Sequence, residues 1–405
     1  MKARRIAVVG TLASDPYAGM AWMHLQIVVG LLRLGHDAYY MEVTSAWPYD
    51  PVQQQRTGNS DYALPYLARV AESFGLAGRW AYRRSYADKK WFGMSQAKAE
   101  ELLAHSDAVF NITGGTRLRT KEELSVNNLV YYGTDPVYPE IGFAQGDPIV
   151  SRTINQHDAF VTYGENIGSP DCPIPPLPRL KAHTRQPVLM DLWEGTVTPR
   201  PVFTTVGNWK QTGRDIEFRG ETYLWSKHHE FLKFIDAPRR SGQAVELATN
   251  LVDPEVTKPG YGEVIRAAGM TTEERDLLAQ NCWRLTSAHA FSTDPWTYRD
   301  YIQSSRAEFT VARDQNVRLR SGWFSERSAC YLAAGRPVIT QDTGFGKYVP
   351  TGEGLFAFNS TEEIIEAFDA IRSDYHRHSR AARRIAEEYF NAETVLEKVV
   401  RDLGL

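Results

Sequence analysis

Short apolar runs alternate with helical patterns along the first half of the chain. Residues 5–10 form an apolar run that ends in glycine, which is typical of a buried strand. Apolar positions then recur at helical spacing over residues 20–32, Gly35 ends the helix, and residues 36–41 indicate the next strand. A strand–helix–strand unit predicts a parallel sheet, because parallel neighbours need a crossover connection. Further strands are predicted at residues 107–112, 128–132 and 159–163, and helices at residues 65–73 and 96–104.

The alternation starts again after a proline-rich stretch. Seven prolines lie between Pro170 and Pro199, and we place the linker at residues 185–201. The two halves are therefore predicted to be two similar βαβ domains in series. In the second half, strands are predicted at residues 201–206, 243–251, 284–286, 308–311 and 337–340, and helices at residues 221–235, 272–280, 326–334, 361–372 and 378–403.

Length, cysteine usage and charge narrow the class of protein. The chain has 405 residues, whereas one core usually stops growing at about 250–300, so two domains are expected. Cys172, Cys282 and Cys330 are odd in number and far apart, which argues against a disulfide framework and a four-ligand zinc site and favours a cytoplasmic protein. No stretch approaches the roughly 20 apolar residues of a membrane span. The net charge of −3 disfavours a nucleic-acid partner but leaves it open, and the oligomeric state is open too.

A helix start in the second half is one candidate phosphate site. Ser325 can cap the helix predicted at residues 326–334, and the unpaired N–H groups of a first helical turn attract anions. Arg318, Arg320 and Arg327 lie close in sequence and would add positive charge. The alternative interpretation is an ordinary helix cap with solvated arginines.

The loop at residues 206–210 is a second candidate. It follows a predicted strand and carries Gly207 and Lys210, and Lys227 comes early in the next predicted helix. Glycine permits close approach of a diphosphate, and lysine supplies charge. Many surface loops have the same composition, so an unremarkable loop is the competing interpretation.

Candidate acceptor and base residues lie at the strand ends of the first half. Asp15 and Gly19 precede the first helix, and Gly114 and Gly115 follow the strand at residues 107–112. Ligands of open α/β sheets bind beyond the carboxyl ends of the strands. Possible general bases are His24, Asp135, His157 and Glu165, although His24 equally fits a core histidine and Asp135, before Pro136, equally fits a turn.

Several other chemistries are excluded by missing motifs. The chain has no GxxxxGK[ST] phosphate loop and no GxGxxG after a strand, which disfavours a P-loop nucleotidase and a dinucleotide-dependent oxidoreductase. HExxH and GxSxG are also missing. His228 and His229 are adjacent and point apart on a helix, so a metal site there is doubtful.

Three segments together resemble the retaining GT-B glycosyltransferases of glycosyltransferase family 4. Residues 19–24, continuing to residues 34–37, resemble the GGxxxHV…L…GH start of that group. Residues 333–344 resemble its EAMAxGxPVVxTDxGG segment, and Gly354-Leu355 with Phe358 resembles its ending. Where the group has two glutamates eight residues apart, this chain has Gly322 and Cys330, with Glu326 between them.

The resemblance implies a fold and an activity. The fold would be GT-B: two facing Rossmann-like domains with parallel sheets, helices on both faces of each sheet, and the active site in the interdomain cleft. Residues 1–190 would form the acceptor-binding domain and residues 191–380 the nucleotide-sugar-binding domain, and a helix at residues 381–405 would pack back toward the first domain. The enzyme would move a sugar from a nucleoside-diphosphate sugar to a hydroxyl or amine of a small molecule or glycan, and domain closure would exclude water.

The resemblance also implies roles for residues. No metal or other cofactor is expected, because cationic side chains and backbone amides would stabilise the leaving diphosphate. Alternatives are a nucleotide-sugar epimerase on the same fold and a non-catalytic nucleotide-sugar-binding or scaffold protein. The expected donor-binding residues are Gly207, Lys210, Lys227, Arg320, Phe324, Ser325, Glu326, Asp342, Thr343 and Gly344; the acceptor-binding residues are Asp15, Gly19, Gly114 and Gly115; the catalytic residues are Asp135, His24 and Glu165.

Overall fold

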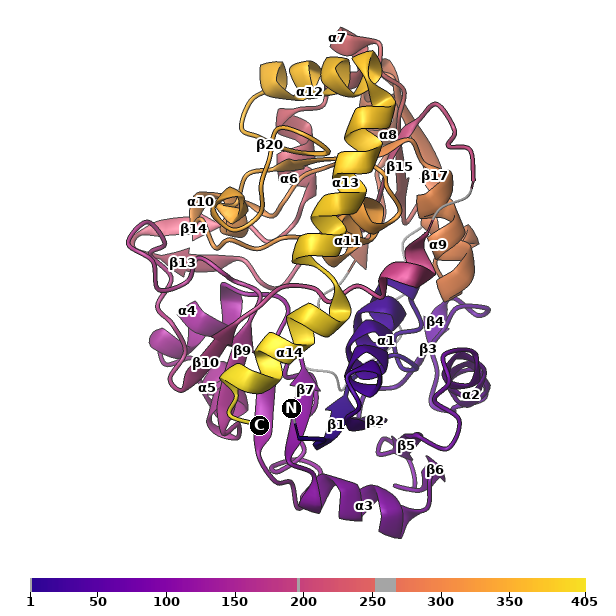
Figure 1. The fold of residues 1–405 in the computed structure, drawn as a ribbon, viewed down its shortest axis with the longest axis vertical. Coiled ribbons are helices and arrows are strands. Elements are labelled where there is room, and N and C mark those ends of the chain that lie inside the picture. Colours follow the sequence, from indigo (N-terminus) through magenta and orange to yellow (C-terminus); the bar gives the residue numbers. More distant parts are fainter. Residues whose placement is uncertain (1, 195–196, 252–266) are drawn as a thin grey trace.

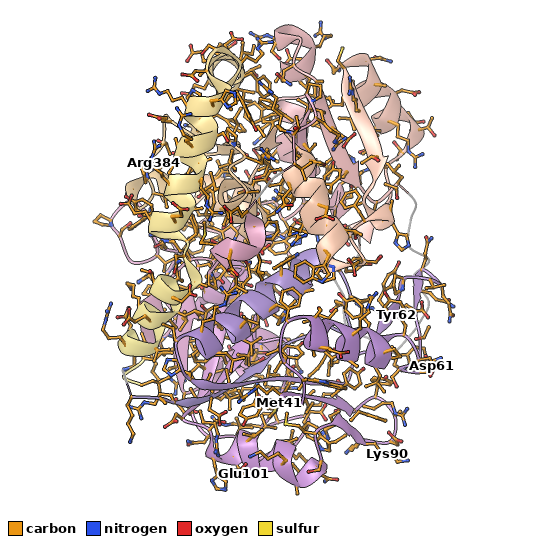
Figure 2. All side chains as sticks on the ribbon, turned by 45° about the vertical axis from the view of Figure 1, so that its right-hand side comes forward. Met41, Asp61, Tyr62, Lys90, Glu101 and Arg384 are labelled. Carbon is orange, nitrogen blue, oxygen red and sulfur yellow. The ribbon has the colours of Figure 1, made fainter. Side chains whose placement is uncertain are left out.

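The chain forms two α/β halves, each built on its own mainly parallel sheet (Figure 1). The structure is a computed structural model that describes residues 2–194, 197–251 and 267–405. Buried side chains such as Met41 fill the layers, whereas Lys90 and Arg384 lie on the surface (Figure 2). In the described part of the chain, no helix is long and apolar enough to cross a membrane.

The first sheet has the strand order β10-β9-β8-β7-β1-β2-β5-β6. β6 pairs antiparallel with β5, and the other neighbours pair in parallel. The strands are β1 (Arg5–Val9), β2 (Asp37–Thr44), β5 (Trp80–Arg84), β6 (Trp91–Gly93), β7 (Ala108–Ile112), β8 (Leu129–Gly133), β9 (Ala159–Thr162) and β10 (Leu180–His183). The accompanying helices are α1 (Ala18–Arg33), α2 (Ala63–Ser73), α3 (Gln96–His105), α4 (Tyr138–Ala144) and α5 (Pro148–Asn155), and a short hairpin joins β3 (Tyr49–Asp50) to β4 (Gln55–Arg56).

The second sheet is parallel throughout its described strands and has the order β17-β15-β11-β18-β19-β20. Its strands are β11 (Phe203–Val206), β15 (Val245–Thr249), β17 (Trp283–Ser287), β18 (Ala307–Thr310), β19 (Val338–Gln341) and β20 (Leu355–Phe358). Its helices are α6 (His228–Lys233), α7 (Ala237–Ser241), α8 (Thr272–Gln280), α9 (Pro295–Ser304), α10 (Asp314–Arg318), α11 (Glu326–Ala333), α12 (Thr361–Ser373), α13 (Tyr375–Tyr389) and α14 (Ala392–Asp402). Smaller elements are the pairs β12 (Lys210–Gln211) with β16 (Ala267–Ala268) and β13 (Ile216–Phe218) with β14 (Glu221–Tyr223), and the 3-10 turns η1 (Met190–Trp193), η2 (Ala288–Ala290) and η3 (Phe345–Lys347).

Both sheets reverse their strand order beside their first strand. β1 lies between β2 and β7, and β11 lies between β15 and β18. At such a switch point the loops leaving the two central strands diverge and open a crevice in which α/β proteins bind ligands. The prediction of two Rossmann-like halves with parallel sheets and flanking helices is confirmed. Each half therefore has a switch point of the kind at which α/β proteins bind ligands.

Two sequence predictions of helices are wrong. The helix expected at residues 221–235 begins only at His228, because Glu221–Tyr223 forms strand β14. Arg219 and Gly220 both have positive φ angles, of 53° and 81°, which is the geometry of a tight two-residue hairpin turn. The helix expected at residues 378–403 is divided into α13 and α14, since Asn391 leaves helical geometry and caps α14.

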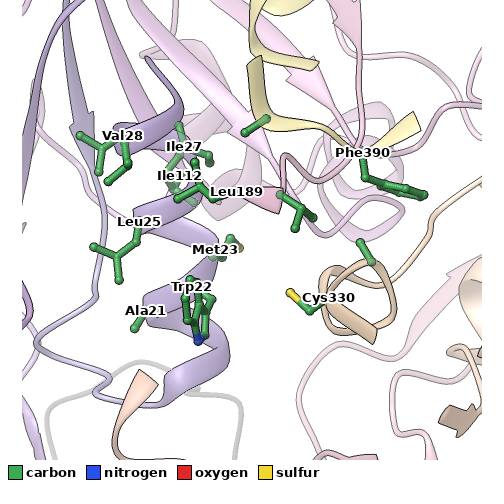
Figure 3. Close-up of a cluster of buried hydrophobic side chains, with 14 of the residues drawn as sticks. Ala21, Trp22, Met23, Leu25, Ile27, Val28, Ile112, Leu189, Cys330 and Phe390 are labelled. Atoms are coloured by element: carbon green, nitrogen blue, oxygen red, sulfur yellow. The ribbon is translucent and has the colours of Figure 1, made fainter. Parts of the chain in front are cut away.

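The two halves share buried apolar side chains on both flanks. On one flank, Trp22 and Met23 of α1 belong to the same buried cluster as Cys330 of α11 and Phe390 (Figure 3). α14 crosses back and packs on α1, where Leu396 lies against Gly30. On the other flank, side chains of the first half and of the β13–β14 hairpin region form one cluster, which contains Val137, Ile141, Ile167, Cys172, Ile174, Ile216, Tyr223 and Leu319.

Candidate functional site

A fixed guanidinium lies beside the first loop of the second sheet. The Nε of Arg327, in the first turn of α11, donates to Glu308 Oε1 at 2.5 Å. Its NH1 donates to the carbonyl of Val206 at 2.5 Å and its NH2 to the hydroxyl of Thr310 at 2.9 Å. A Cβ added to Gly207 would lie 3.7 Å from Arg327 NH1. The loop after β11 and the guanidinium therefore adjoin at the switch point, where a small pocket opens between them.

Lys227 lines the same pocket, and its ammonium forms no ion pair with a carboxylate in the described part of the chain. Among the described residues, no hydrogen bond or ion pair involves its Nζ, which lies 5.5 Å from the ring centroid of Trp323. Burial lowers the pKa of Lys227 well below its usual value, and the charges of Arg327 and Arg313 lower it further. A bound anion would reverse that shift, because a nearby negative charge favours the ammonium form.

A second cationic group joins this region to the first half. The guanidinium of Arg313 lies 3.5 Å from the ring centroid of Trp225 and forms an ion pair with Asp135, which follows β8. Arg214 lies 3.7 Å from the same carboxylate. With all groups ionised, four cations, Lys227, Arg327, Arg313 and Arg214, face the two carboxylates of Glu308 and Asp135. The surplus positive charge suits a diphosphate.

The start of α11 is where the sequence predicted an anion site. Ser325 occupies the N-cap position with extended backbone angles, and its side chain makes no capping hydrogen bond. Arg327 belongs to this site, as its position in the sequence suggested. Arg318 and Arg320 do not, because each is engaged elsewhere: Arg318 with Asp314, and Arg320 with Asp171 at 3.2 Å and Asp342 at 3.5 Å.

Other predicted donor residues are engaged by their neighbours. Lys210 forms an ion pair of 2.8 Å with Glu274 of α8, so its charge is neutralised, in contrast to Lys227. Phe324 is buried against Phe345 and Phe390. The remaining predicted residues shape the loop after β19: Thr343 donates to the carbonyl of Trp323 at 2.6 Å, and Gly344 N donates to Asp342 at 2.8 Å.

Glu326 holds the two halves together. Its carboxylate accepts hydrogen bonds from Gln26 of α1 at 2.9 Å and from the thiol of Cys330 at 3.2 Å. The Oε1 of Gln26 accepts in turn from the backbone N–H of Leu189 and the indole N–H of Trp193. Burial raises the pKa of Glu326 to about 7.

The two missing glutamates have a packing explanation. Gly322 has φ of 77°, and a Cβ there would lie 2.6 Å from the backbone nitrogen of Asn166 in the first half. A side chain at position 322 would therefore collide with backbone. Cys330 is fully buried between α11 and α1, so a carboxylate at its position would have to lie inside the shared cluster.

His24 and His157 are held in the buried interior of the first half. His24 Nδ1 donates to the carbonyl of Met20 at 2.6 Å, and its Nε2 accepts from Thr11 N at 3.4 Å. The His24 ring packs so closely on Gly10 that a Cβ on Gly10 would lie 2.0 Å from it. Burial lowers the pKa of His24 to about 4, so it is neutral at pH 7. His157 is held similarly, and burial lowers its pKa to about 4 as well.

The candidate carboxylates of the first half are all paired with arginine. Asp15 accepts from Arg56 at 2.6 Å, and Glu165 accepts from Arg185 at 2.6 Å. Burial raises the pKa of Glu165, although Arg185 partly opposes that effect. Asp135 differs in one respect, because its arginine partners belong to the cationic region of the second half.

The predicted glycines surround the switch point of the first sheet. A Cβ on Gly115 would lie 3.9 Å from Thr11, so the loops after β7 and β1 adjoin. Gly114 has φ of 62° and lies against Tyr131, and Gly19 faces the hydroxyl of Tyr298 in the second half, 3.8 Å from its would-be Cβ. Among the described residues, no cluster of three histidine, cysteine or carboxylate side chains could hold a metal ion.

Sequence reasoning did not single out Arg313, nor Trp225 and Trp323, whose rings contact the cationic groups of this region. Arg313 follows β18, and its strand-end position beside the switch point was the available signal. Trp225 lay within the wrongly predicted helix, and Trp323 was passed over although its neighbours were singled out.

Comparison with solved structures identifies the fold. The Anabaena protein HepE, in complex with UDP and glucose, matches with a TM-score of 0.57 at 11% identity over 99% of both chains. An alpha-glucosyltransferase in complex with UDP and a 13-mer DNA matches with a TM-score of 0.54 at 9% identity over both whole chains. Sucrose-phosphate synthase from Thermosynechococcus elongatus matches with a TM-score of 0.52 at 10% identity over 98% of both chains. No protein-family profile and no curated protein matches the sequence. The chain has the GT-B fold of glycosyltransferases.

Proposed function

We propose that this chain transfers a sugar from a nucleoside-diphosphate sugar to a hydroxyl or amine acceptor, without a metal ion, on its GT-B fold. The observation that carries the proposal is the unpartnered ammonium of Lys227 beside Arg327 and the Gly207 loop. These groups meet at the switch point of the second sheet, where a diphosphate would find cationic donors and a close backbone approach.

The contacts of Arg327 suit it to stabilise a leaving diphosphate. Negative charge develops on the diphosphate as its bond to the anomeric carbon breaks, and donors that are already fixed in place need no reorganisation. Three acceptors within the protein fix the Arg327 guanidinium. Lys227 would supply the second charge, and the N–H groups at the start of α11 would add to it.

Asp135 is the proposed general base for the acceptor. It follows β8 in the first half and meets the cationic region through Arg313 and Arg214. As a base, its carboxylate would take the proton of an acceptor hydroxyl that binds between the two halves. His24 and His157 are less suitable, since hydrogen bonds and burial hold them in the core.

A uridine nucleotide is the first donor to test. The HepE and alpha-glucosyltransferase structures both contain UDP, which makes UDP-glucose a reasoned probe for this chain. We expect UDP to bind the wild-type protein and Lys227→Met to weaken that binding about 10- to 100-fold, because a hydrogen bond to a charged group contributes about 1.5–3 kcal/mol.

Lys210→Met is the matched control, and isothermal titration calorimetry with UDP measures the affinity of the wild type and of both variants. It removes a lysine that Glu274 already neutralises, so UDP should bind it nearly as well as the wild type. Equal affinities for the wild type and Lys227→Met would refute the proposed phosphate site. A wild-type protein that binds no nucleoside diphosphate would refute the proposed function.

One observation favours a second candidate, a nucleotide-sugar-binding protein without transferase activity. Asp135 and Glu165, the two carboxylates among the predicted bases, are each paired with arginine, which leaves no uncommitted carboxylate among those bases. Incubation of UDP-glucose with and without an acceptor mixture separates the possibilities. Transfer supports the enzyme, conversion without acceptor supports an epimerase, and binding without turnover supports the second candidate.

A further inference from the structure

Trp323 is fixed at the boundary between the two halves. Its indole N–H donates to the carbonyl of Thr134, at the end of β8, at 3.0 Å. Its backbone N–H donates to Ser321 at 3.2 Å, and its carbonyl accepts from Thr343 at 2.6 Å. The indole hydrogen bond to Thr134 therefore orients the side chain, the two backbone hydrogen bonds hold the residue in place, and the side chain is still partly exposed.

One face of this indole looks toward the proposed phosphate site. The Nζ of Lys227 lies 5.5 Å from the ring centroid, in a cation–π contact. A sugar attached to a phosphate at Lys227 would therefore lie close to the same ring, because only one glycosidic oxygen separates the sugar from the phosphorus atom. Aromatic rings are characteristic walls of ligand sites, because their faces offer a rigid apolar surface to C–H groups.

We propose that the indole of Trp323 is the platform on which the transferred sugar of the donor stacks, which makes Trp323 a specificity-determining residue. The inference rests on the proposed function and assigns a pyranose with an apolar C–H face to this position. When the donor binds, the ammonium of Lys227 leaves the ring face for the diphosphate, and the sugar ring takes its place. The exchange is favourable in direction, because the ammonium exchanges a cation–π contact with a neutral ring for a charge-assisted hydrogen bond to an anionic phosphate.

The test compares UDP with UDP-glucose on two variants of Trp323. We expect Trp323→Ala to weaken UDP-glucose about tenfold more than it weakens UDP, since the variant removes the stacking face. Trp323→Phe keeps an aromatic face and loses the hydrogen bond to Thr134, so its preference for UDP-glucose should stay within about twofold of the wild type. Circular dichroism and thermal unfolding check that each variant is folded.

Trp91→Ala is the matched control. Trp91 lies on β6, at the far edge of the first sheet, is also partly exposed, and has Arg83 5.9 Å from its ring centroid. Its replacement should change neither affinity. Equal losses of UDP and UDP-glucose in Trp323→Ala would overturn the inference, because the tryptophan would then act only through Lys227.

The phenylalanine variant provides a second way to overturn the inference. If Trp323→Phe loses as much UDP-glucose affinity as Trp323→Ala, the hydrogen bond to Thr134 matters and the ring face does not. A wild-type protein that binds UDP but shows no variant-dependent difference for UDP-glucose also overturns the sugar platform. A wild-type protein that binds neither nucleotide overturns the proposed function itself, and the two failures are thereby distinguished.

Discussion

Three buried carboxyl groups accept hydrogen bonds from backbone N–H groups or side chains and so stabilise the structure around them. Glu42 accepts from the N–H groups of Ala13 and Ser14 at 2.8 and 2.7 Å and so shapes the loop after β1. Glu140 accepts from Val137 N at the start of α4. Glu326 accepts from Gln26 across the two halves. Burial raises the pKa of each of these carboxyl groups to about 7.

The raised pKa of Glu326 predicts a pH-dependent stability. A carboxyl group whose pKa is about 7 in the folded chain and near 4.5 when unfolded stabilises the fold fully below pH 4.5 and loses that contribution as the pH rises through 7. We expect Glu326→Gln, measured against the wild type by urea unfolding, to gain relative stability between pH 5.5 and 7.5, by at most about 3 kcal/mol.

The comparison needs a control for the loss of one charge. Glu397→Gln removes an exposed carboxylate on α14, and its difference from the wild type should not vary with pH over this range. A stability difference for Glu326→Gln that is the same at pH 5.5 and 7.5 would contradict the assignment.

At the residue scale, the sequence could predict a phosphate site that contains lysine, but not which of two lysines would be available to bind the phosphate. Lys210 and Lys227 looked equivalent, and only the fold brings Glu274 to Lys210 while leaving Lys227 with Trp323. The sequence could not decide whether His24 is a general base or a core histidine, for a related reason. Its burial depends on Gly10, which the chain brings beside it only after α1 has packed on β1.

Among the elements, α14 shows how a short amphipathic helix joins distant parts of the chain. It packs on α1, where Gly30 leaves room for Leu396: a Cβ on Gly30 would lie 2.5 Å from the Cδ1 of Leu396. The helix entry is fixed by backbone bonds on either side of Asn391, since Val188 N donates to Phe390 O and Ala392 N donates to Val188 O.

We therefore expect Leu396→Ala to destabilise the first half of the molecule. Leu396 is fully buried, and truncating a buried leucine to alanine typically costs about 2–5 kcal/mol. Denaturant unfolding measures the loss, and hydrogen exchange should show faster exchange of the α1 amides. Glu397→Ala, one residue further on the exposed face, should stay within about 0.5 kcal/mol of the wild type. Unchanged protection of α1 in Leu396→Ala would contradict this role.

The prediction of helices and strands succeeded where the local sequence carried one clear signal, such as a helix cap. The helix expected at residues 272–280 coincides with α8, whose N-cap Thr271 and Glu274 form a capping box. It failed where the turn chemistry was not recognised, since Arg219-Gly220 closes the β13–β14 hairpin inside an otherwise helix-like stretch. The packing of that hairpin on the first half has no local signal, because its partners are far away in sequence.

The whole molecule has an interface between its halves that resembles a core. Apolar clusters span the halves on both flanks, and Asn166 adds polar contacts, donating to the carbonyl of Arg320 at 2.7 Å and accepting from Tyr348 at 3.1 Å. Relative domain motion is the usual expectation unless the interface is large and hydrophobic. We therefore expect the two halves to move less freely than the closing motion implied by the family resemblance would require.

A shared core predicts cooperative unfolding of both halves. We expect differential scanning calorimetry to show one transition, with a van't Hoff enthalpy close to the calorimetric enthalpy, because neither half can expose its inner flank without disrupting the other. Two separated transitions, or a van't Hoff enthalpy near half the calorimetric value, would show that the halves are independent.

The packing of α14 on α1 also has a consequence for the order in which the protein is made. The ribosome synthesises α1 early, but about 370 further residues follow before α14 is complete. At about 5–20 residues per second, the side of α1 that α14 covers stays bare for roughly 20–70 s. The half that emerges first can therefore complete its packing only after the last helix has emerged, and until then Gly30 and its apolar neighbours on α1 stay uncovered.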